Sequence, residues 1–445
     1  MNRDTQKRLF NLCDPREPLG PDDPRYVDVD AFAGAPRGRR WVEVLASPIE
    51  MASRPVCTLL AAQPGAGLTT ELRSLAGRLR DPSGANLLPV HIDAVEVLDL
   101  HSTIDVSDVL LAIVEKVEVA VHAAEGQPGK RLARFWRWLR DTSPEITEEE
   151  TEFAATTILR ASPRARSAFR LNVSAEHSRF VSEVRNELTL LNGRARRLGR
   201  GGLVVLFDGI TRLRGDSTTW KEVLASAERL FGMDASYLEL PVHVVYTVPA
   251  PLALRLSTPI LFFPQIALLD RAGKRAAGLD AAREIVRRRV GDEELAQVFA
   301  AYGGHKPRTN AGRPITDDHS PKGNPEAWVD ELLLWSAGNP RDIVQLLRNS
   351  IIEAMLHPPR FKQMLSLSAD GLRRTTPETA NPWLARVHIE KTLAFPDDQR
   401  LLADRLVLDG AVLRYQNGEG WYDVHPVLLE TSRVSAEIAR LSRSA

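Results

Sequence analysis

The segment VCTLLAAQPGAGLTTELRSL, residues 56–75, determines how this chain folds. Its apolar start, residues 56–61, has the length and composition of a buried strand. The turn-forming residues Gln63–Gly67 follow, and residues 69–79 have the pattern of a helix. A strand, a glycine turn and a helix in succession begin a βαβ unit. The next parallel strand is expected at residues 87–93.

Two further apolar runs extend this unit. Residues 203–208 and 242–247 read as strands, and a helix over 220–231 separates them. Apolar strands separated by helices are typical of a parallel sheet buried on both faces. The sequence therefore predicts an α/β fold with a parallel sheet at its core.

The turn of the first segment has the frame of a phosphate-binding loop, G/A-x-x-x-x-G-K-[ST]. In such a loop backbone N–H groups surround the phosphates, the lysine neutralises their oxygens and the hydroxyl holds Mg²⁺. Gly65, Gly67 and Thr69 match the pattern, but Leu68 occupies the lysine position. Because an apolar side chain cannot stabilise charge on a transferring phosphoryl group, Leu68 argues against catalysis. The alternative is an ordinary glycine turn.

Polar residues end the two following strands. Asp208 is the candidate Mg²⁺-supporting carboxylate, together with Thr69, although an acid-capped turn would look the same. The neighbouring position that usually carries a second acid offers only Thr211, so no general base is evident. Thr247 ends the next strand, where a polar group faces the terminal phosphate in parallel α/β sheets.

A Gly-Asn-Pro-Arg sequence, residues 338–341, opens an amphipathic helix. In one interpretation it resembles the sensor-2 sequence of the AAA+ helical lid, and that resemblance implies that Arg341 reaches across to the phosphates. In the other, Asn339 is an N-cap, Pro340 occupies the first helical position and Arg341 is solvated.

In this order, the loop frame, the strand ends, the Gly-Asn-Pro-Arg helix and a C-terminal hairpin unit resemble the STAND and Orc/Cdc6-like branch of AAA+ P-loop ATPases, over roughly residues 40–430. The runs TTELR (69–73) and NGEGWYDVHP (417–426) are similar to segments of bacterial STAND-like proteins. The departures at Leu68 and Thr211 resemble the inactive STAND subset. That resemblance implies a non-hydrolysing adaptor of a bacterial antiphage, or conflict, system.

The expected fold is thus a P-loop NTPase parallel sheet core with a helical insertion, a helical lid and a winged-helix-like C-terminal domain. The predicted boundaries are an extended N-terminal arm at 1–40, the α/β core at 41–270 with its insertion at about 125–200, the lid at 271–375 and the winged-helix-like domain at 376–445. The hairpin 412–415/421–424 turns at Asn417-Gly418, a strong hairpin signal. The loop 303–325 is rich in Gly, Pro, Asn and Lys.

Composition narrows the choice of partners. The chain has 445 residues, equal numbers of basic and acidic residues (58 each) and two cysteines. No overall field draws it to nucleic acid or a membrane surface. The polar start lacks a signal peptide's apolar core, and no stretch of about 18 apolar residues suggests a span. Together with the few cysteines, this predicts a cytoplasmic protein.

Two basic regions leave nucleic acid open as a partner. Residues 130–140 mix Lys and Arg with Phe135, Trp136 and Trp138, and are interpreted either as a base-stacking surface or as an amphipathic helix with a buried aromatic face. Residues 160–200 hold ten Arg against three Glu, which would meet an acidic partner or a nucleic-acid backbone. The hairpin tip is uncharged or acidic, which favours protein contact over DNA there.

Three functions follow from these residues. The first is a degenerate regulatory or scaffold protein that binds other proteins of its system, or copies of itself, with at most residual binding of ATP or ADP with Mg²⁺. The second is an active nucleotide switch whose missing cation comes from elsewhere. The third is a DNA-binding regulator that uses the winged-helix-like unit.

Overall fold

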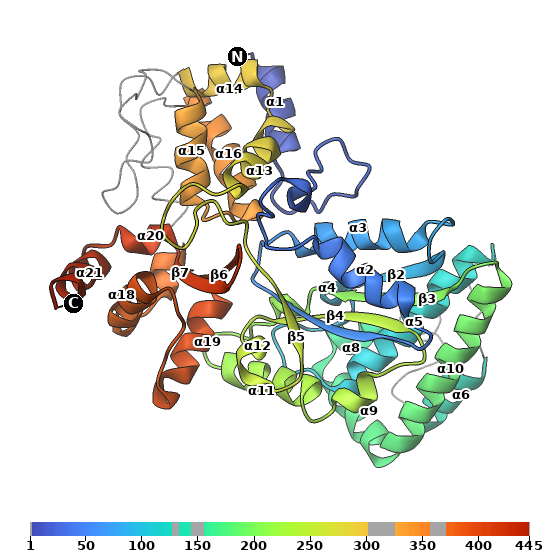
Figure 1. Cartoon of the computed structure of the whole chain (residues 1–445). Helices are drawn as coiled ribbons and strands as arrows, with labels where there is room; N and C mark the ends of the chain where they lie inside the picture. Colours follow the sequence, from blue (N-terminus) through green and yellow to red (C-terminus); the bar gives the residue numbers. More distant parts are fainter. Residues whose placement is uncertain (1, 127–132, 144–154, 301–324, 357–370, 445) are drawn as a thin grey trace. The chain divides into compact units, whose positions relative to one another are not determined.

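The computed structural model describes residues 2–126, 133–143, 155–300, 325–356 and 371–444 (Figure 1). The chain divides into two compact units. We call Val42–Ala62 with Glu71–Phe262 the sheet unit, and Met1–Trp41 with Gln63–Thr70 and Phe263–Ala445 the lid unit. The glycine loop therefore groups with residues distant from it in the sequence.

A five-stranded sheet, ordered β2-β3-β4-β1-β5, forms the centre of the sheet unit. The pairs β2–β3, β3–β4 and β4–β1 are parallel, and every residue of β3 is buried. The strands are β1 (Cys57–Ala62), β2 (Leu87–Asp93), β3 (Gly202–Asp208), β4 (His243–Pro249) and β5 (Ile260–Phe263). The predicted α/β core with a parallel sheet is confirmed.

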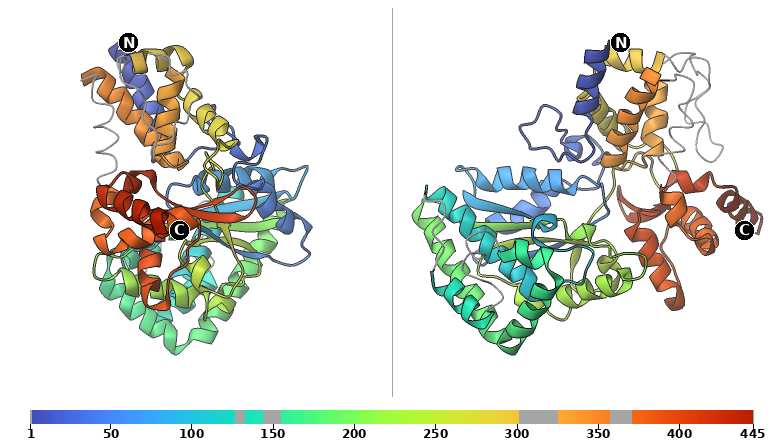
Figure 2. Two further views of the ribbon diagram at one scale, coloured as in Figure 1. Left: turned by 60° about the vertical axis from the view of Figure 1, so that its left-hand side comes forward. Right: turned by 180° about the vertical axis from the view of Figure 1, so that it is seen from behind.

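Helices cover both faces of this sheet. Helices α2 and α3 lie on one face, and α5 and α10 pack on the other, against β2 and β3 (Figures 1 and 2). Right-handed crossovers require this arrangement, because the chain moves across the sheet in one direction after β1 and returns after β2. The helices are α2 (Trp41–Met51), α3 (Leu68–Arg80), α4 (Ala94–Val97), α5 (Val106–Ala124), α11 (Trp220–Phe231) and α12 (Leu252–Arg255), with short 3-10 turns at Ile210–Arg212 and Ala235–Leu238.

The region between β2 and β3 carries the predicted helical insertion. Its described helices are α6 (Ala133–Thr142), α8 (Ala155–Ala161), α9 (Pro163–Ala175) and α10 (His177–Arg197). The basic residues at 130–132 and the acidic run at 145–152 lie outside the described residues.

The N-terminal arm is not extended as predicted. Residues Arg3–Leu12 form helix α1, which Asn2 caps by accepting from the Thr5 backbone N–H at 2.8 Å. Leu9 and Cys13 are fully buried in an apolar core shared with the lid helices. The helix forms because the free energy gained by burying these side chains outweighs the turn-forming tendency of the arm. Farther along the arm, a 3-10 turn occupies Val29–Ala31.

The lid helices are α13 (Gly278–Arg287), α14 (Asp292–Ala300), α15 (Pro325–Trp335) and α16 (Pro340–Leu356). Most of the Gly- and Pro-rich loop at 303–325 lies outside the described residues.

The C-terminal part has the predicted helix-and-hairpin composition. Its elements are α18 (Asn381–Glu390), α19 (Arg400–Leu408), β6 (Val412–Gln416), β7 (Gly420–Val424), α20 (Pro426–Leu429) and α21 (Ser432–Ser444), with 3-10 turns at Glu378–Ala380 and Asp397–Gln399. The predicted hairpin is present, and its register places Tyr415 opposite Trp421. Among the described helices, none is both long and apolar enough to cross a membrane.

Candidate functional site

The glycine loop connects the end of β1 to the start of α3, as the phosphate-loop frame predicts. Gly65 and Gly67 have φ angles of 88° and 91°, in the left-handed region that side chains disfavour. At Gly65 a Cβ atom would also lie 2.4 Å from the Asn339 side-chain oxygen. Both glycines are therefore required by backbone conformation, and Gly65 additionally by contact with the lid.

The lid helix α16 begins directly against this loop. The Asn339 amide nitrogen donates to the Pro64 carbonyl at 2.9 Å, and the Arg341 backbone N–H donates to the Gly65 carbonyl at 3.2 Å. The Asn339 oxygen meanwhile accepts from the Arg341 N–H at 3.1 Å, as the N-cap reading predicts. The structure thus brings Gly65 and Arg341 together through backbone atoms, while the Arg341 side chain is exposed.

Arg37 supplies a third contact with the loop. Its guanidinium donates to the Ala66 carbonyl at 3.0 Å and lies 4.6 Å from the centre of the Phe263 ring. It is 3% exposed, and it is 4.0 Å from the Asp30 carboxylate. A guanidinium from the N-terminal arm therefore lies against the loop. No local sequence pattern marked Arg37, because 28 residues separate it from Gly65.

The cation position of the loop is apolar in the structure as well. Leu68 is the first residue of α3 and is 7% exposed. Thr69 follows it and is half-buried. Glycines in this conformation and a hydroxyl after them fit a phosphate, whereas the buried leucine does not.

The predicted strand-end residues lie in the sheet unit. Asp208 ends β3 and is 2% exposed, and Thr247 lies in the neighbouring strand β4 and is fully buried. Among the described residues, the Thr247 hydroxyl has no hydrogen-bond partner. An Asp208 oxygen lies 3.6 Å from the His91 Nε2 atom, and the other accepts from the Gly209 N–H at 2.7 Å. Ligands bind at strand carboxyl ends in open α/β sheets. Asp208 lies at such an end, whereas β4 continues to Pro249, two residues beyond Thr247, and a nucleotide-binding role of either residue stays a prediction.

The metal prediction rests on Thr69 and Asp208, which belong to different units. Within the described ranges, no three His, Cys, Asp or Glu side chains gather as a metal-binding group. Oxygen ligands from one carboxylate and one hydroxyl suit Mg²⁺ bound mainly by water and phosphate. The magnesium site stays a prediction.

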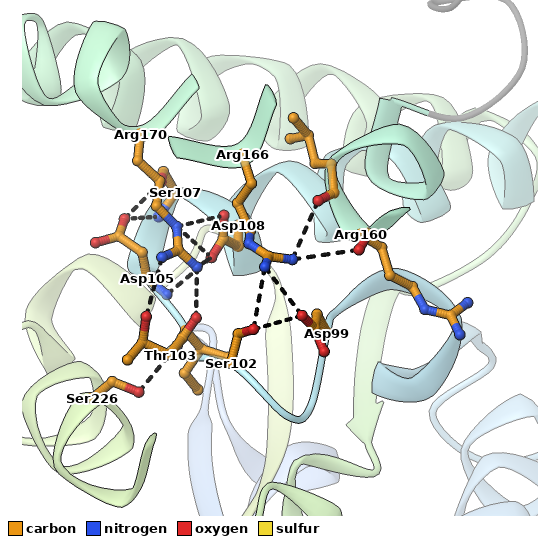
Figure 3. Close-up of polar contacts among 12 residues, drawn as sticks. Asp99, Ser102, Thr103, Asp105, Ser107, Asp108, Arg160, Arg166, Arg170 and Ser226 are labelled. Carbon is orange, nitrogen blue, oxygen red and sulfur yellow. Dashed lines mark hydrogen bonds and ion pairs between the residues drawn. The ribbon is translucent and has the colours of Figure 1, made fainter. Parts of the chain in front are cut away.

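The Arg-rich region pairs with acidic residues outside itself. Figure 3 shows Arg166 and Arg170, from α9, pointing toward the segment that precedes α5. Arg166 lies 3.1 Å from Asp99, and Arg170 contacts Asp108 at 2.5 Å. These four side chains line a cavity with the Arg160 side chain, which points away from them. The arginines thus anchor the insertion to the sheet unit.

Burial sets the protonation behaviour of this network. Burial raises the pKa of Asp108, and the hydrogen bond from Arg170 opposes that rise. A third ion pair, Arg194 with Glu125, joins α10 to the end of α5. In this way three of the ten arginines at 160–200 pair with carboxylates outside that region.

The aromatic side chains of α6 face the interior. Phe135, Trp136 and Trp138 are at most 8% exposed. The Trp136 Nε1–H donates to Glu118 at 2.6 Å. This arrangement supports the amphipathic-helix interpretation, because buried rings are not available to stack on bases.

A packed histidine directly follows the C-terminal hairpin. His425 is 8% exposed, and its Nδ1 accepts from the Val427 N–H at 3.3 Å. At the hairpin tip, the Asn417 oxygen accepts from the Trp421 Nε1–H at 2.7 Å.

No protein-family model matches the chain, and no curated protein matches it. Among solved structures, it is similar to a Walker-type ATPase of Pyrococcus abyssi, at 15% identity over 95% of this chain and 99% of that one, with a TM-score of 0.41. Cdc6p of Pyrobaculum aerophilum matches at 12% identity over 97% and 98%, with a TM-score of 0.35. The Aeropyrum pernix ORC1 protein, solved in complex with DNA, matches at 16% identity over 96% and 97%, with a TM-score of 0.37.

Proposed function

We propose that the chain is a catalytically degenerate NTPase-fold protein of the AAA+/STAND type, which acts as a regulatory or scaffold subunit and has at most residual nucleotide binding. The observation that carries this proposal is Leu68. Its side chain is buried at the position where a phosphate loop places its lysine.

The physical argument concerns charge. Phosphoryl transfer depends almost entirely on positioning and electrostatic stabilisation, so a loop without its cation loses the main source of catalysis. The loop also takes part in contacts that hold the chain together. Its carbonyl groups at Pro64, Gly65 and Ala66 accept hydrogen bonds from the lid helix and from the N-terminal arm. A loop engaged in this way can act as a structural joint.

The test is direct. ATP hydrolysis and nucleotide affinity of the purified protein are measured with Mg²⁺. We expect no turnover above background and weak or undetectable affinity. Turnover near about 1 s⁻¹, the low end for working phosphoryl-transfer enzymes, would refute the proposal.

One observation favours the second candidate, a nucleotide switch with a cation from elsewhere. Arg37 brings a guanidinium to the loop, 3.3 Å from where a Cβ of Gly67 would lie. If this charge substitutes for the lysine, Arg37→Met abolishes nucleotide binding, while Arg39→Met, at an exposed position two residues away, leaves it intact. Equal effects of the two variants would remove this candidate.

We also propose that the partners are other proteins of the same system, in the cytoplasm, with homo-oligomers as an alternative. The antiphage setting comes from the sequence resemblance. The buried aromatics of α6 and the paired arginines of α9 weaken the nucleic-acid alternative, because the rings are not available to bases and two of the ten arginines at 160–200 pair with carboxylates of the chain. Mass measurement in solution tests self-association, and co-purification with neighbouring gene products tests the protein partners.

A further inference from the structure

The side chain of Gln63, the first loop residue after β1, contacts the C-terminal hairpin region rather than solvent. Its Nε2 group donates to the Val412 carbonyl at 2.6 Å and to the Val407 carbonyl at 3.2 Å. Its Oε1 atom accepts from the Arg414 backbone N–H at 2.9 Å. Gln63 is 3% exposed, so these bonds form away from water. We call these contacts the loop–hairpin contact.

The loop–hairpin contact joins three elements. Val407 lies near the end of α19, and Val412 and Arg414 belong to β6. One edge of β6 pairs with β7. The Arg414 backbone, whose N–H donates to Gln63, also accepts at its carbonyl oxygen from the Gln265 N–H at 3.0 Å. At this point the Gln63 side chain therefore bonds to the β6 backbone in the way that a neighbouring strand would.

The surrounding packing leaves the loop little freedom. Tyr415 of β6 donates from its hydroxyl to the Ala337 carbonyl at 2.9 Å, two residues before the Asn339 that bonds to the loop. Leu413, Tyr415 and Ala337 share one buried apolar cluster. Movement of the loop would thus disturb contacts with both α16 and β6.

We propose that the glycine loop and the hairpin form one coupled regulatory element. In this element, any change in loop conformation weakens the hydrogen bonds that hold β6 in place through Gln63. The buried Gln63 amide both donates and accepts hydrogen bonds, so it cannot shift without leaving polar groups unsatisfied. The contact is therefore either fully formed or lost. Coupling of this kind is reciprocal, so loosening β6 also frees the loop. The inference deepens the proposed scaffold function by naming its regulated step, and it does not require that nucleotide binds.

Substitutions of Gln63 test the contact in the full-length protein without nucleotide. Gln63→Leu removes all three bonds at similar volume. Gln63→Glu keeps an acceptor for the Arg414 N–H but places a carboxylate against two carbonyl oxygens. Gln399→Leu is the matched control, because that side chain is only half-buried, lies in the same unit and bonds only to the adjacent Asp398 among the described residues.

The readout is hydrogen exchange of the peptide covering residues 410–416, which contains the Arg414 amide. In Gln63→Leu we expect exchange roughly 5- to 100-fold faster than in the parent, as for loss of a buried hydrogen-bonded group, and no change in the control. In Gln63→Glu we expect fast exchange at neutral pH and a return toward the parent rate in acid, relative to the parent at each pH, because a protonated carboxyl donates again.

Unchanged exchange at residues 410–416 in Gln63→Leu would overturn the proposal. Identical behaviour of Gln63→Glu and Gln63→Leu at every pH would also overturn it, since shape rather than hydrogen bonding would then be responsible. The reciprocal measurement uses Tyr415→Phe, for which we expect faster exchange of loop residues 64–68; an unchanged loop contradicts coupling. ATP turnover by the parent would refute the scaffold proposal and leave these exchange results standing.

Discussion

Replacing Leu68 by lysine restores the charge that the phosphate-loop frame lacks. An ammonium about 4 Å from a phosphate oxygen gains about 4 kcal/mol at the effective dielectric typical of a protein surface. Desolvation of the ammonium reduces this gain. We therefore expect the affinity for Mg²⁺-ATP to rise by about 1.4–2.8 kcal/mol, or roughly ten- to hundredfold.

The same substitution destabilises the nucleotide-free protein. Leu68 is 7% exposed, and removing such a side chain from the interior costs about 1.5–3 kcal/mol. Faster amide hydrogen exchange in the first turns of α3 measures this cost locally. Leu68→Met is the control, because it keeps the apolar volume and adds no charge.

The affinity assay is calorimetric titration of the parent, Leu68→Lys and Leu68→Met with Mg²⁺-ATP. Binding by Leu68→Lys that is no tighter than by Leu68→Met would refute the reasoning, since the loop would then not be a phosphate site. Equally tight binding by the parent would also refute it, because the missing cation would not be what limits affinity.

Three further predictions concern single side chains. Asp208→Ala in the lysine-restored protein should weaken Mg²⁺-ATP binding at least about tenfold, and unchanged calorimetric affinity would remove Asp208 from the site. Burial raises the pKa of Asp99, but hydrogen bonds including that from Arg166 outweigh it and hold the pKa below its ordinary value. The stability that Asp99 contributes is therefore present above its ordinary pKa and lost as pH falls through the lowered one; Arg166→Met should reduce this acid sensitivity in the exchange of α9, and an identical pH profile would contradict the pairing. Trp136→Phe removes the donor to Glu118, which is 2% exposed, and should cost about 1–3 kcal/mol in the local stability of α6. This cost should be seen as faster exchange of α6 than in a control with the half-buried Trp220 replaced, Trp220→Phe, whereas equal rates would count against that bond.

The sheet was predictable because its information is local. Each central strand is a short apolar run, and such runs are stable only where both faces of a sheet are covered. The hairpin was equally local, since Asn417-Gly418 marks its turn. The strand β5 was missed because it is only four residues long and lies between two prolines, Pro259 and Pro264.

Other errors came from contacts between distant segments. The arm around α1 is rich in turn-forming residues, but Leu9 and Cys13 meet the lid core, and that burial decides the helix. The Arg-rich insertion looked like a binding surface because its partners, such as Asp99 and Asp108, lie about 60 residues earlier, beyond any local pattern.

The sequence by itself determined the α/β core, the glycine loop and the absence of a lysine at residue 68, because strand patterns, turn glycines and residue identity are properties of short segments. Only the tertiary structure decided what surrounds the loop. Arg37 and Asn339 donate hydrogen bonds to carbonyl groups of the loop, and the Gln63 side chain of the loop bonds to β6. These hydrogen bonds join segments up to about 350 residues apart. Such pairings depend on how the whole chain packs, and no spacing within the sequence encodes them.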